Sequence, residues 1–358
     1  MFYVLYDKNF KSIGRTRSTY PVNTWKWTRR AFEFDELTIE GMKFKNMDGA
    51  MFVALQEDKG TIRAVALSGI PSVSETTAKI NAIDPRRMLD TEALIDLERR
   101  FTGLTALYAY LISIVFDTYS MKQVSSSKYI LSGGNPFSEI IIDCQSLYDN
   151  HVNVQTDAIV AEQAIGNVWN TIQSINAVHG TALLASIDIV AKALTFKVVV
   201  ITDEININLE DFGTKKVVRD SLYTNRVICY NKEHSSIEVY YLTQEDQVFS
   251  QNAVDFEKIQ YPIQTKIFEA DDISEARAEG LKELYNNRFK CNVQIDATSS
   301  AMGDLLKGLS FSTQANIYAF NSEERGVFKT LPLMEIAEDS NGNYKVTFGR
   351  LNNYWWLK

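Results

Sequence analysis

Two of the rarest residue types in this chain lie close together between Thr224 and Gln244. Cys229 is one of three cysteines, and His234, five positions later, is one of three histidines. A histidine that deprotonates a thiol makes a nucleophilic dyad, but the two groups must lie within about 3 Å of each other. The secondary structure around the pair decides whether that distance can be reached.

The sequence around Cys229 and His234 predicts a β-hairpin. The runs "RVICYN" and "IEVYYL" are strand-like, and pairing Ile228 with Val239 puts apolar partners together across one face. His234 then lies at the turn and Cys229 about four residues down a strand, so roughly 13 Å separates them at ~3.3 Å per residue. We therefore expect a half-buried Cys229, an exposed His234 and no dyad.

Other candidate sites are weaker still. The segment "IDCQSLYDNH" holds Asp143, Cys144, Asp149 and His151, but it lacks the close ligand pairs of structural zinc sites. His179 precedes a glycine at the predicted end of a helix, which is typical of a cap. Neither "SGGNP" nor any other segment matches a phosphate loop or a hydrolase motif. We expect no catalytic residue, no metal, no cofactor and no enzyme activity.

Composition and charge indicate a globular protein of ordinary type. Hydrophobic residues make up 45% of the 358 residues, charged residues 23%, and the formal net charge is −8. An acidic chain does not bind phosphate backbones by bulk electrostatics, so we expect no specific nucleic-acid binding. The short basic pairs are Arg29-Arg30, Arg86-Arg87 and Lys215-Lys216, and we expect them to be solvated surface.

Targeting signals are not evident in the sequence. The N-terminus has no basic region followed by an apolar one, which predicts no secretory signal. The longest nearly apolar run, residues 104–116, is too short to span a bilayer. The cysteines form no disulfide framework. We expect synthesis in a reducing cytoplasm and no contact with a membrane.

The order of predicted elements suggests three parts. Residues 1–84 contain short aromatic and β-branched strands and predict a first β-rich barrel segment. Residues 85–195 predict a mixed, helix-rich insertion. Residues 196–358 predict a second β-rich segment with one helix over 272–288 and a closing C-terminal hairpin. The fold class expected is α+β, with β-barrel-like domains interrupted by the insertion.

The insertion and the hairpin allow more detailed predictions. Apolar residues spaced three and four apart predict a helix over 104–116 that lies either in the core or at an interface. Two more helices are predicted, roughly over 158–178 and 182–194. In the closing hairpin, a three-residue loop ending at Gly342 pairs Ile336 with Val346 and Met334 with Phe348, and it gives Gly342 the left-handed position.

Two tryptophan pairs remain, Trp25 with Trp27 and Trp355 with Trp356. They can pack onto the chain's own β-unit. Tryptophan is also enriched at protein interfaces, so all four are candidates for a subunit interface.

The order of elements resembles the tail hub proteins of phage baseplates, including the N-terminal hub region of tail-associated proteins in phages or prophages of Gram-positive hosts. The resemblance covers nearly the whole chain. It is carried by a linking segment and helix, a strand returning to the β-layer, and a late helix leading to the closing strands, namely "DPRRMLDTEALIDLERRFTGLTALYAYLISIVF", "TNRVICYN" and "SEARAEGLKELYNNRFKCNVQID" followed by "GLSFSTQANIYAF".

The resemblance implies a structural role without catalysis. It implies a homotrimer whose barrel domains form a ring around a channel that DNA crosses. Such a hub joins the tail tube, or a distal tail ring, to the tip or spike, with the tape measure protein as a further partner. It implies assembly in the bacterial cytoplasm and a final place in the virion. A receptor- or carbohydrate-binding assembly module is the alternative, and a cell-wall hydrolase a more distant one.

Overall fold

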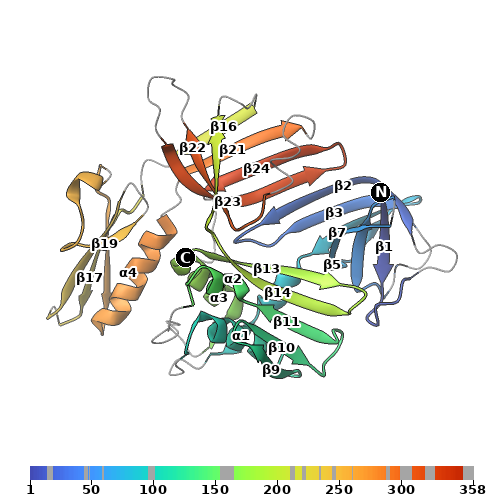
Figure 1. Cartoon of the computed structure of the whole chain (residues 1–358), viewed down its shortest axis with the longest axis horizontal. Helices are drawn as coiled ribbons and strands as arrows, with labels where there is room; N and C mark the ends of the chain where they lie inside the picture. The colour runs from blue at the N-terminus through green and yellow to red at the C-terminus, as the bar shows by residue number, and fades with distance from the viewer. Residues whose placement is uncertain are drawn as a thin grey trace.

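The computed structural model describes most of the chain and shows four packed units (Figure 1). The description covers residues 1–13, 19–43, 47, 49–58, 60–95, 101–153, 165–209, 214–219, 223–233, 235–243, 247–259, 261–287, 291–298, 309–318 and 327–349. Within these ranges the protein is mostly β, with several sheets and four α-helices. The expected α+β class therefore applies only in the sense that a few helices accompany many strands.

The first unit is a small barrel made from the N-terminal strands. Its strand order is β1-β4-β5-β7-β3-β2, and β1 also pairs with β2, which closes the ring. Its interior is filled by apolar side chains from every large strand, such as Leu5, Trp25, Ile39 and Leu55. The strands are β1 Phe2–Tyr6, β2 Tyr20–Arg30, β3 Glu36–Met42, β4 Phe52–Gln56, β5 Ile62–Leu67, β6 Ser72–Val73 and β7 Thr77–Ile83.

The central unit holds the largest hydrophobic core and three of the four helices. Its five-stranded sheet has the order β13-β14-β11-β10-β9, with β11 and β14 parallel. The elements are η1 Pro85–Leu89, β8 Glu92–Leu94, α1 Leu104–Val115, β9 Ser120–Ser125, β10 Lys128–Ser132, β11 Glu139–Asp143, α2 Gln145–Asp149, β12 Ile165–Asn167, α3 Val168–His179, β13 Thr181–Asp188 and β14 Ala193–Val200.

Helix α1 settles the choice between core and interface in favour of the core. Eight of its twelve residues are buried, and they include Leu104, Leu107, Tyr108 and Leu111. The residue that caps its first turn comes from far along the chain, because Asn153 Oδ1 accepts the Thr105 N–H at 3.0 Å.

One predicted helix of the insertion is wrong. Residues 182–194, expected to be helical, form most of β13, the turn that follows it and the first two residues of β14. Gly180 adopts φ 61° and ends α3 in a left-handed cap, so the chain reverses before Thr181. From there β13 pairs with β14 over eight residues. The other predicted helix starts late, since α3 covers Val168–His179 and residues 154–164 lie outside the description.

The third unit is a second barrel-like sheet with the order β15-β22-β23-β24-β21-β16. Apolar residues of these strands, including Ile295, Ile317, Leu331 and Phe348, form its core. The strands are β15 Asp203–Asn208, β16 Thr214–Arg219, β21 Cys291–Thr298, β22 Thr313–Tyr318, β23 Val327–Asp339 and β24 Asn343–Gly349. Strands β2 and β23 pair, so the sheets of the two barrels form one 13-stranded sheet.

The closing hairpin has the predicted turn and most of the predicted register. Ile336 pairs with Val346 as expected, and Gly342 has φ 75°. A β-bulge between Leu333 and Glu335 changes the next pair, so that Phe348 faces Leu333 rather than Met334. A bulge adds one residue to one strand, which is why the pairing shifts by one position beyond it.

The fourth unit, hereafter the lobe (residues 223–287), is inserted between β16 and β21. Its sheet has the order β19-β18-β17-β20, and α4 packs on one face through Val227, Cys229, Leu242, Ala276 and Leu284. Figure 1 shows α4 between these strands and the rest of the molecule. The elements are β17 Arg226–Asn231, β18 Ile237–Leu242, β19 Val248–Ser250, η3 Phe256–Lys258, β20 Thr265–Ala270 and α4 Ile273–Asn287.

Candidate functional site

The pairing of β2 with β23 creates a seam between the two barrels, and charged side chains line it on both faces. The register sets Arg30 opposite Glu335 and Trp27 opposite Glu338. Neighbouring strand residues point to opposite faces of a sheet. The adjacent arginines Arg29 and Arg30 therefore point to different faces of the seam, and each meets a different glutamate of β23.

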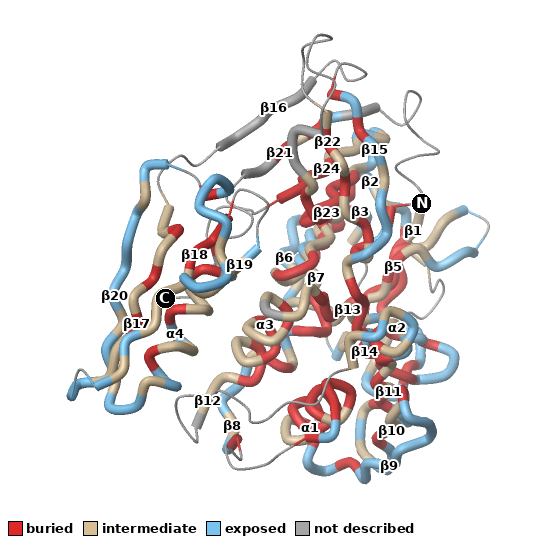
Figure 2. Tube along the Cα trace, turned by 60° about the vertical axis from the view of Figure 1, so that its left-hand side comes forward, coloured by how far each residue is buried: buried red, intermediate tan, exposed pale blue. Residues whose placement is uncertain are grey.

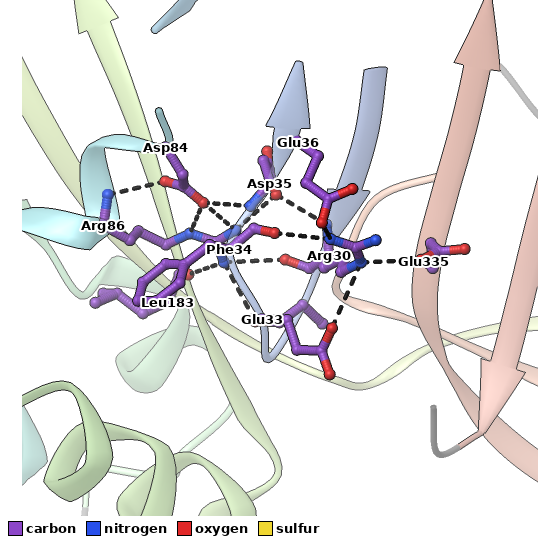
Figure 3. Close-up of polar contacts among 10 residues, drawn as sticks. Arg30, Glu33, Phe34, Asp35, Glu36, Asp84, Arg86, Leu183 and Glu335 are labelled. Atoms are coloured by element: carbon purple, nitrogen blue, oxygen red, sulfur yellow. Dashed lines mark hydrogen bonds and ion pairs between the residues drawn. The ribbon is translucent and has the colours of Figure 1, made fainter. Parts of the chain in front are cut away.

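On one face, Arg30 binds a carboxylate of the second barrel and the chain around it. Its Nε donates to Glu335 Oε2 at 2.9 Å and its Nη1 lies 3.1 Å from Glu36 Oε1. The Arg30 backbone N–H donates to Asp35 Oδ1 at 2.8 Å. The turn between β2 and β3 is thereby fixed to β23 by one guanidinium group (Figure 3).

On the other face, Glu338 collects cationic side chains of the first barrel. Arg63 Nη2 donates to Glu338 Oε2 at 2.5 Å, and Arg29 Nη2 lies 4.0 Å from Glu338 Oε1. The two arginines also stack on tryptophans, with Arg63 5.0 Å from the Trp25 ring centroid and Arg29 4.9 Å from that of Trp27. Charge pairing and cation–π contact therefore act together here.

Arg86 extends the network into the central unit. Its side chain is 2% exposed, and its Nε donates to Asp84 Oδ2 at 2.8 Å. Its Nη2 donates to Asp35 Oδ1 at 2.6 Å, while its Nη1 donates to the carbonyl oxygens of Arg30 at 2.9 Å and of Leu183 at 3.0 Å (Figure 3). One buried arginine thus joins the β2–β3 turn, η1 and β13.

The Arg86 network is more acidic than basic. Two guanidinium groups, of Arg30 and Arg86, face five carboxyl groups, those of Glu33, Asp35, Glu36, Asp84 and Glu335. Burial raises the pKa of Asp35 from 3.8 to about 6, against the opposing attraction of Arg86. Burial likewise raises the pKa of Glu33. The ionisation of Asp35 is therefore sensitive to pH in a range where ordinary aspartates are fully charged.

Sequence reasoning missed this site because it treated the basic pairs as surface. Arg86 and Arg30 are buried or nearly so, whereas Arg87, the neighbour of Arg86, is 56% exposed, pairs with Asp90 and lies over the Phe34 ring. A local signal was present for one of them, since Asp84 precedes Pro85 and caps η1 through the Arg86 N–H. Glu335 lies 305 positions from Arg30, and no spacing rule links residues so far apart.

The predicted interface tryptophans fall into two groups. Trp25 is buried in the core of the first barrel, and Trp27 packs against the same core. Both lie at the seam, where the two barrels of one chain meet. Trp355 and Trp356 lie outside the described residues. A role in subunit contact remains a prediction for all four.

The segment that contains Cys229 and the predicted hairpin is indeed a hairpin of β17 and β18. Strands β17 and β18 pair Ile228 with Val239 as predicted. Cys229 is fully buried rather than half-buried, because α4 covers it, and burial raises the pKa of its thiol to about 11. His234 lies outside the described residues. Cys144 is also buried, and burial raises its pKa to about 12.

Among the described residues, no group of three or more His, Cys, Asp and Glu side chains is arranged to hold a metal ion. None of the described helices combines the length and the apolar character needed to cross a bilayer. His179 is partly buried at the end of α3, and burial lowers its pKa.

Comparison with known proteins adds what the geometry alone does not give. No protein-family model and no curated protein sequence matches the chain. Solved structures do match it over essentially its full length. A tail protein from Neisseria meningitidis has 11% identity and a TM-score of 0.56, and the match covers 100% of this chain and 99% of that one.

Two prophage proteins match similarly. Prophage tail protein gp18 from Listeria monocytogenes has 10% identity and a TM-score of 0.54, with 99% of this chain and 95% of that one covered. A 43 kDa tail protein of prophage MuSo2 from Shewanella oneidensis has 12% identity and a TM-score of 0.52, with 98% and 97% covered. At these identities the likeness concerns the fold: from end to end, this chain has the fold of phage and prophage tail proteins.

Proposed function

We propose that this protein is a structural tail hub, a homotrimeric ring at the tail tip or baseplate. The observation that carries the proposal is the match of the fold, over 98–100% of this chain, to three tail proteins. A non-enzymatic role agrees with buried thiols whose raised pKa values keep them protonated at neutral pH.

The two barrels joined at a seam suit a ring. In a ring of identical subunits each subunit meets its neighbours through two different surfaces. The seam holds the two barrels of one subunit in a fixed relation through Arg30–Glu335 and Arg63–Glu338. Three copies would then place six barrel units around one axis, and the angle at the seam would set the diameter of the channel.

The proposed hub joins the tail tube, or a distal tail ring, to the tip or spike, with the tape measure protein as a further neighbour. DNA would cross its channel without being held, since the chain carries a net charge of −8 and like charges repel. We further propose that the chain divides into three domains, with boundaries at 84/85 and 195/196. Subunits would meet through Trp25, Trp27, Trp355 and Trp356, and the phage or prophage would belong to a Gram-positive host.

Light scattering coupled to size exclusion tests the trimer, and end-on electron microscopy of the purified protein tests the ring. A trimer has a mass of about 122 kDa, three times the 40.7 kDa of one chain. The images should show three-fold symmetry around an open centre. A protein that stays monomeric from micromolar to near-millimolar concentration, in low and in moderate salt, would contradict the proposal.

A further inference from the structure

The lobe has one sheet face that α4 does not cover, and the short helix η3 covers that face in part, where Phe256 packs on the buried ring of Tyr241. Alternation along the strands sends Val227 and Cys229 towards α4, where a Cβ on Gly280 would come within 2.5 Å of Cys229 Sγ. The neighbouring residue Ile228 points away from α4, together with its partners Val239 and Ile267. Figure 1 shows this side of the sheet turned away from the rest of the molecule.

This outward face carries a row of apolar side chains between two polar pairs, Arg226 with Thr265 and Tyr230 with Glu269. Ile237 is 63% exposed, Ile267 59% and Phe256 50%, and Phe256 packs against the ring of Tyr241 at 5.5 Å between centroids. The exposed character of β20 is visible along its length in Figure 2. We define the outward face by six residues, Ile228, Ile237, Val239, Phe249, Phe256 and Ile267. Exposed apolar side chains gathered on one face in this way indicate an interaction site.

Charge narrows the choice of partner. The lobe carries twelve aspartates and glutamates against six lysines and arginines, a formal charge of −6 out of the −8 of the whole chain. The acidic residues Asp255, Glu257 and Glu269 are exposed beside the outward face. A partner that is both apolar and cationic would match the face and its surroundings.

The chain itself contains such a segment. Residues 350–358, "RLNNYWWLK", hold Tyr354, Trp355, Trp356 and two leucines, with Arg350 and Lys358 as cations and no carboxylate side chain. Tryptophan, tyrosine and arginine are the residue types that dominate binding energy at interfaces. Nine residues extend at most about 30 Å, against about 20 Å for a six-residue strand such as β17.

The point where this segment leaves the second barrel determines whether it can reach the outward face of its own copy or only that of a neighbouring copy. Gly349, the last residue of β24, pairs with Asn292. The residue before Asn292, Cys291, pairs with Arg219. The segment therefore leaves the second barrel beside Arg219 and Cys291, the residues between which the lobe is inserted. Helix α4 stands between the strands of the lobe and the rest of the molecule (Figure 1), so the outward face of the same copy lies on the far side of its own helix.

We propose that residues 350–358 of one copy dock on the outward face of the lobe of the next copy around the ring. The inference rests on the proposed trimer and names one of its subunit contacts. The aromatic side chains of the segment cover Ile228, Val239 and Ile267, and its two cations lie near the acidic edge of the lobe. The two surfaces differ, as a head-to-tail ring requires.

Association of the full chain and three variants tests the contact. Sedimentation equilibrium should show at least tenfold weaker association for Ile267→Asp and for the double variant Trp355→Ala/Trp356→Ala. Ile70→Asp is the matched control, because Ile70 is 96% exposed but belongs to the first barrel segment, and it should associate as the parent does. Combining Ile267→Asp with Trp355→Ala/Trp356→Ala should weaken association no further than either variant alone, since both variants remove the same contact.

Cross-linking distinguishes a neighbour from the same copy. With Thr265→Cys at the exposed edge of the outward face and Trp356→Cys in the segment, oxidation should give dimers and trimers on a non-reducing gel. Thr265→Cys alone should not. A disulfide formed only within monomers would overturn the proposal, and so would unchanged association of Ile267→Asp.

The outcomes separate this inference from the hub itself. If the parent chain is a trimer and the face and tail variants remain equally stable trimers, the hub proposal stands and the docking contact is wrong. If the parent chain never associates, both are wrong. Association through the proposed contact should also weaken as sodium chloride rises from 50 to 500 mM, because opposite charges are screened.

Discussion

Arg30 and Glu335 lie 305 positions apart in the chain, yet Arg30 Nε donates to Glu335 Oε2 at 2.9 Å where the two barrels meet. The backbones of the same two residues are partners in the β2–β23 pairing. The charge pair therefore fixes both the register of the seam and the position of the turn that follows β2. The central unit joins the same network through Arg86.

Replacing Arg86 by Met should destabilise the protein strongly. The change leaves Asp84 and Asp35 without their buried cation and the carbonyls of Arg30 and Leu183 without a donor. Breaking a buried pair in this way costs about 3–5 kcal/mol, measurable by urea unfolding. Arg87→Met is the control, and its exposed pair with Asp90 should contribute less than about 1 kcal/mol. Equal losses for both variants would contradict the buried role of Arg86.

Asp35 should make the protein more stable as the pH falls towards 4. Its folded pKa, raised to about 6 by burial, lies above its value of 3.8 in the unfolded chain. The folded state therefore binds the proton more tightly, so the contribution to the free energy of unfolding is complete below pH ~4 and lost as the pH rises through about 6. The linkage amounts to at most about 3 kcal/mol.

The test compares urea unfolding of the parent and of Asp35→Asn between pH 4.5 and 8. The parent should gain stability relative to the variant as the pH falls, whereas Glu36→Gln, which changes a 71% exposed carboxylate, should follow the parent. A constant difference between the parent and Asp35→Asn at every pH would show that Asp35 titrates normally.

Gly280→Ala should destabilise the lobe even though alanine favours helices. An alanine Cβ at this position comes within 2.5 Å of Cys229 Sγ and 3.1 Å of Val227 Cγ2. The clash costs about 1–3 kcal/mol, which exceeds the gain in helix propensity of about 1 kcal/mol. In a Cys229→Ala background the same change should be neutral or stabilising. Thermal unfolding of the four proteins of this cycle gives the coupling energy.

Tyr108→Phe should cost about 1–3 kcal/mol, because the tyrosine hydroxyl is buried between two polar partners. It donates to Asn176 Oδ1 at 2.6 Å and lies 2.9 Å from Thr181 Oγ1. Tyr148→Phe is the comparison, since its hydroxyl donates to the Ser126 carbonyl at an exposed position. Urea unfolding should rank Tyr108→Phe well above Tyr148→Phe. A reversed order would mean that the buried hydroxyl contributes little.

Local patterns predicted the parts of the fold that local physics determines. The β17–β18 hairpin has the expected pairing of Ile228 with Val239, and the closing hairpin has the expected left-handed Gly342. Helix α4 occupies Ile273–Asn287 against an expected 272–288. In each case side-chain alternation, a turn residue or a helical stripe selects one arrangement among a few.

Local sequence patterns could not predict contacts between segments that are far apart in the chain. Residues 182–194 are apolar enough for a helix, but pairing of β13 with β14 makes them a hairpin of two strands joined by a turn. Among the strands that the structure describes, three pairings are parallel, β11 with β14, β15 with β22 and β17 with β20. Parallel strands need long connections. The seam site depends on β2 meeting β23, so its arginines look like surface residues until the partner strand is known.

Strands β16 and β21 are direct neighbours, and Arg219 pairs with Cys291 at the point where the lobe begins and ends. The lobe is thus a cassette whose two ends meet on adjacent strands. Insertions at such points leave the host sheet intact. Exchange of the segment between Arg219 and Cys291 for another one would keep the described strand pairings of the second barrel. The part of the molecule that carries most of its negative charge can therefore diverge at a different rate from the barrels to which it is attached.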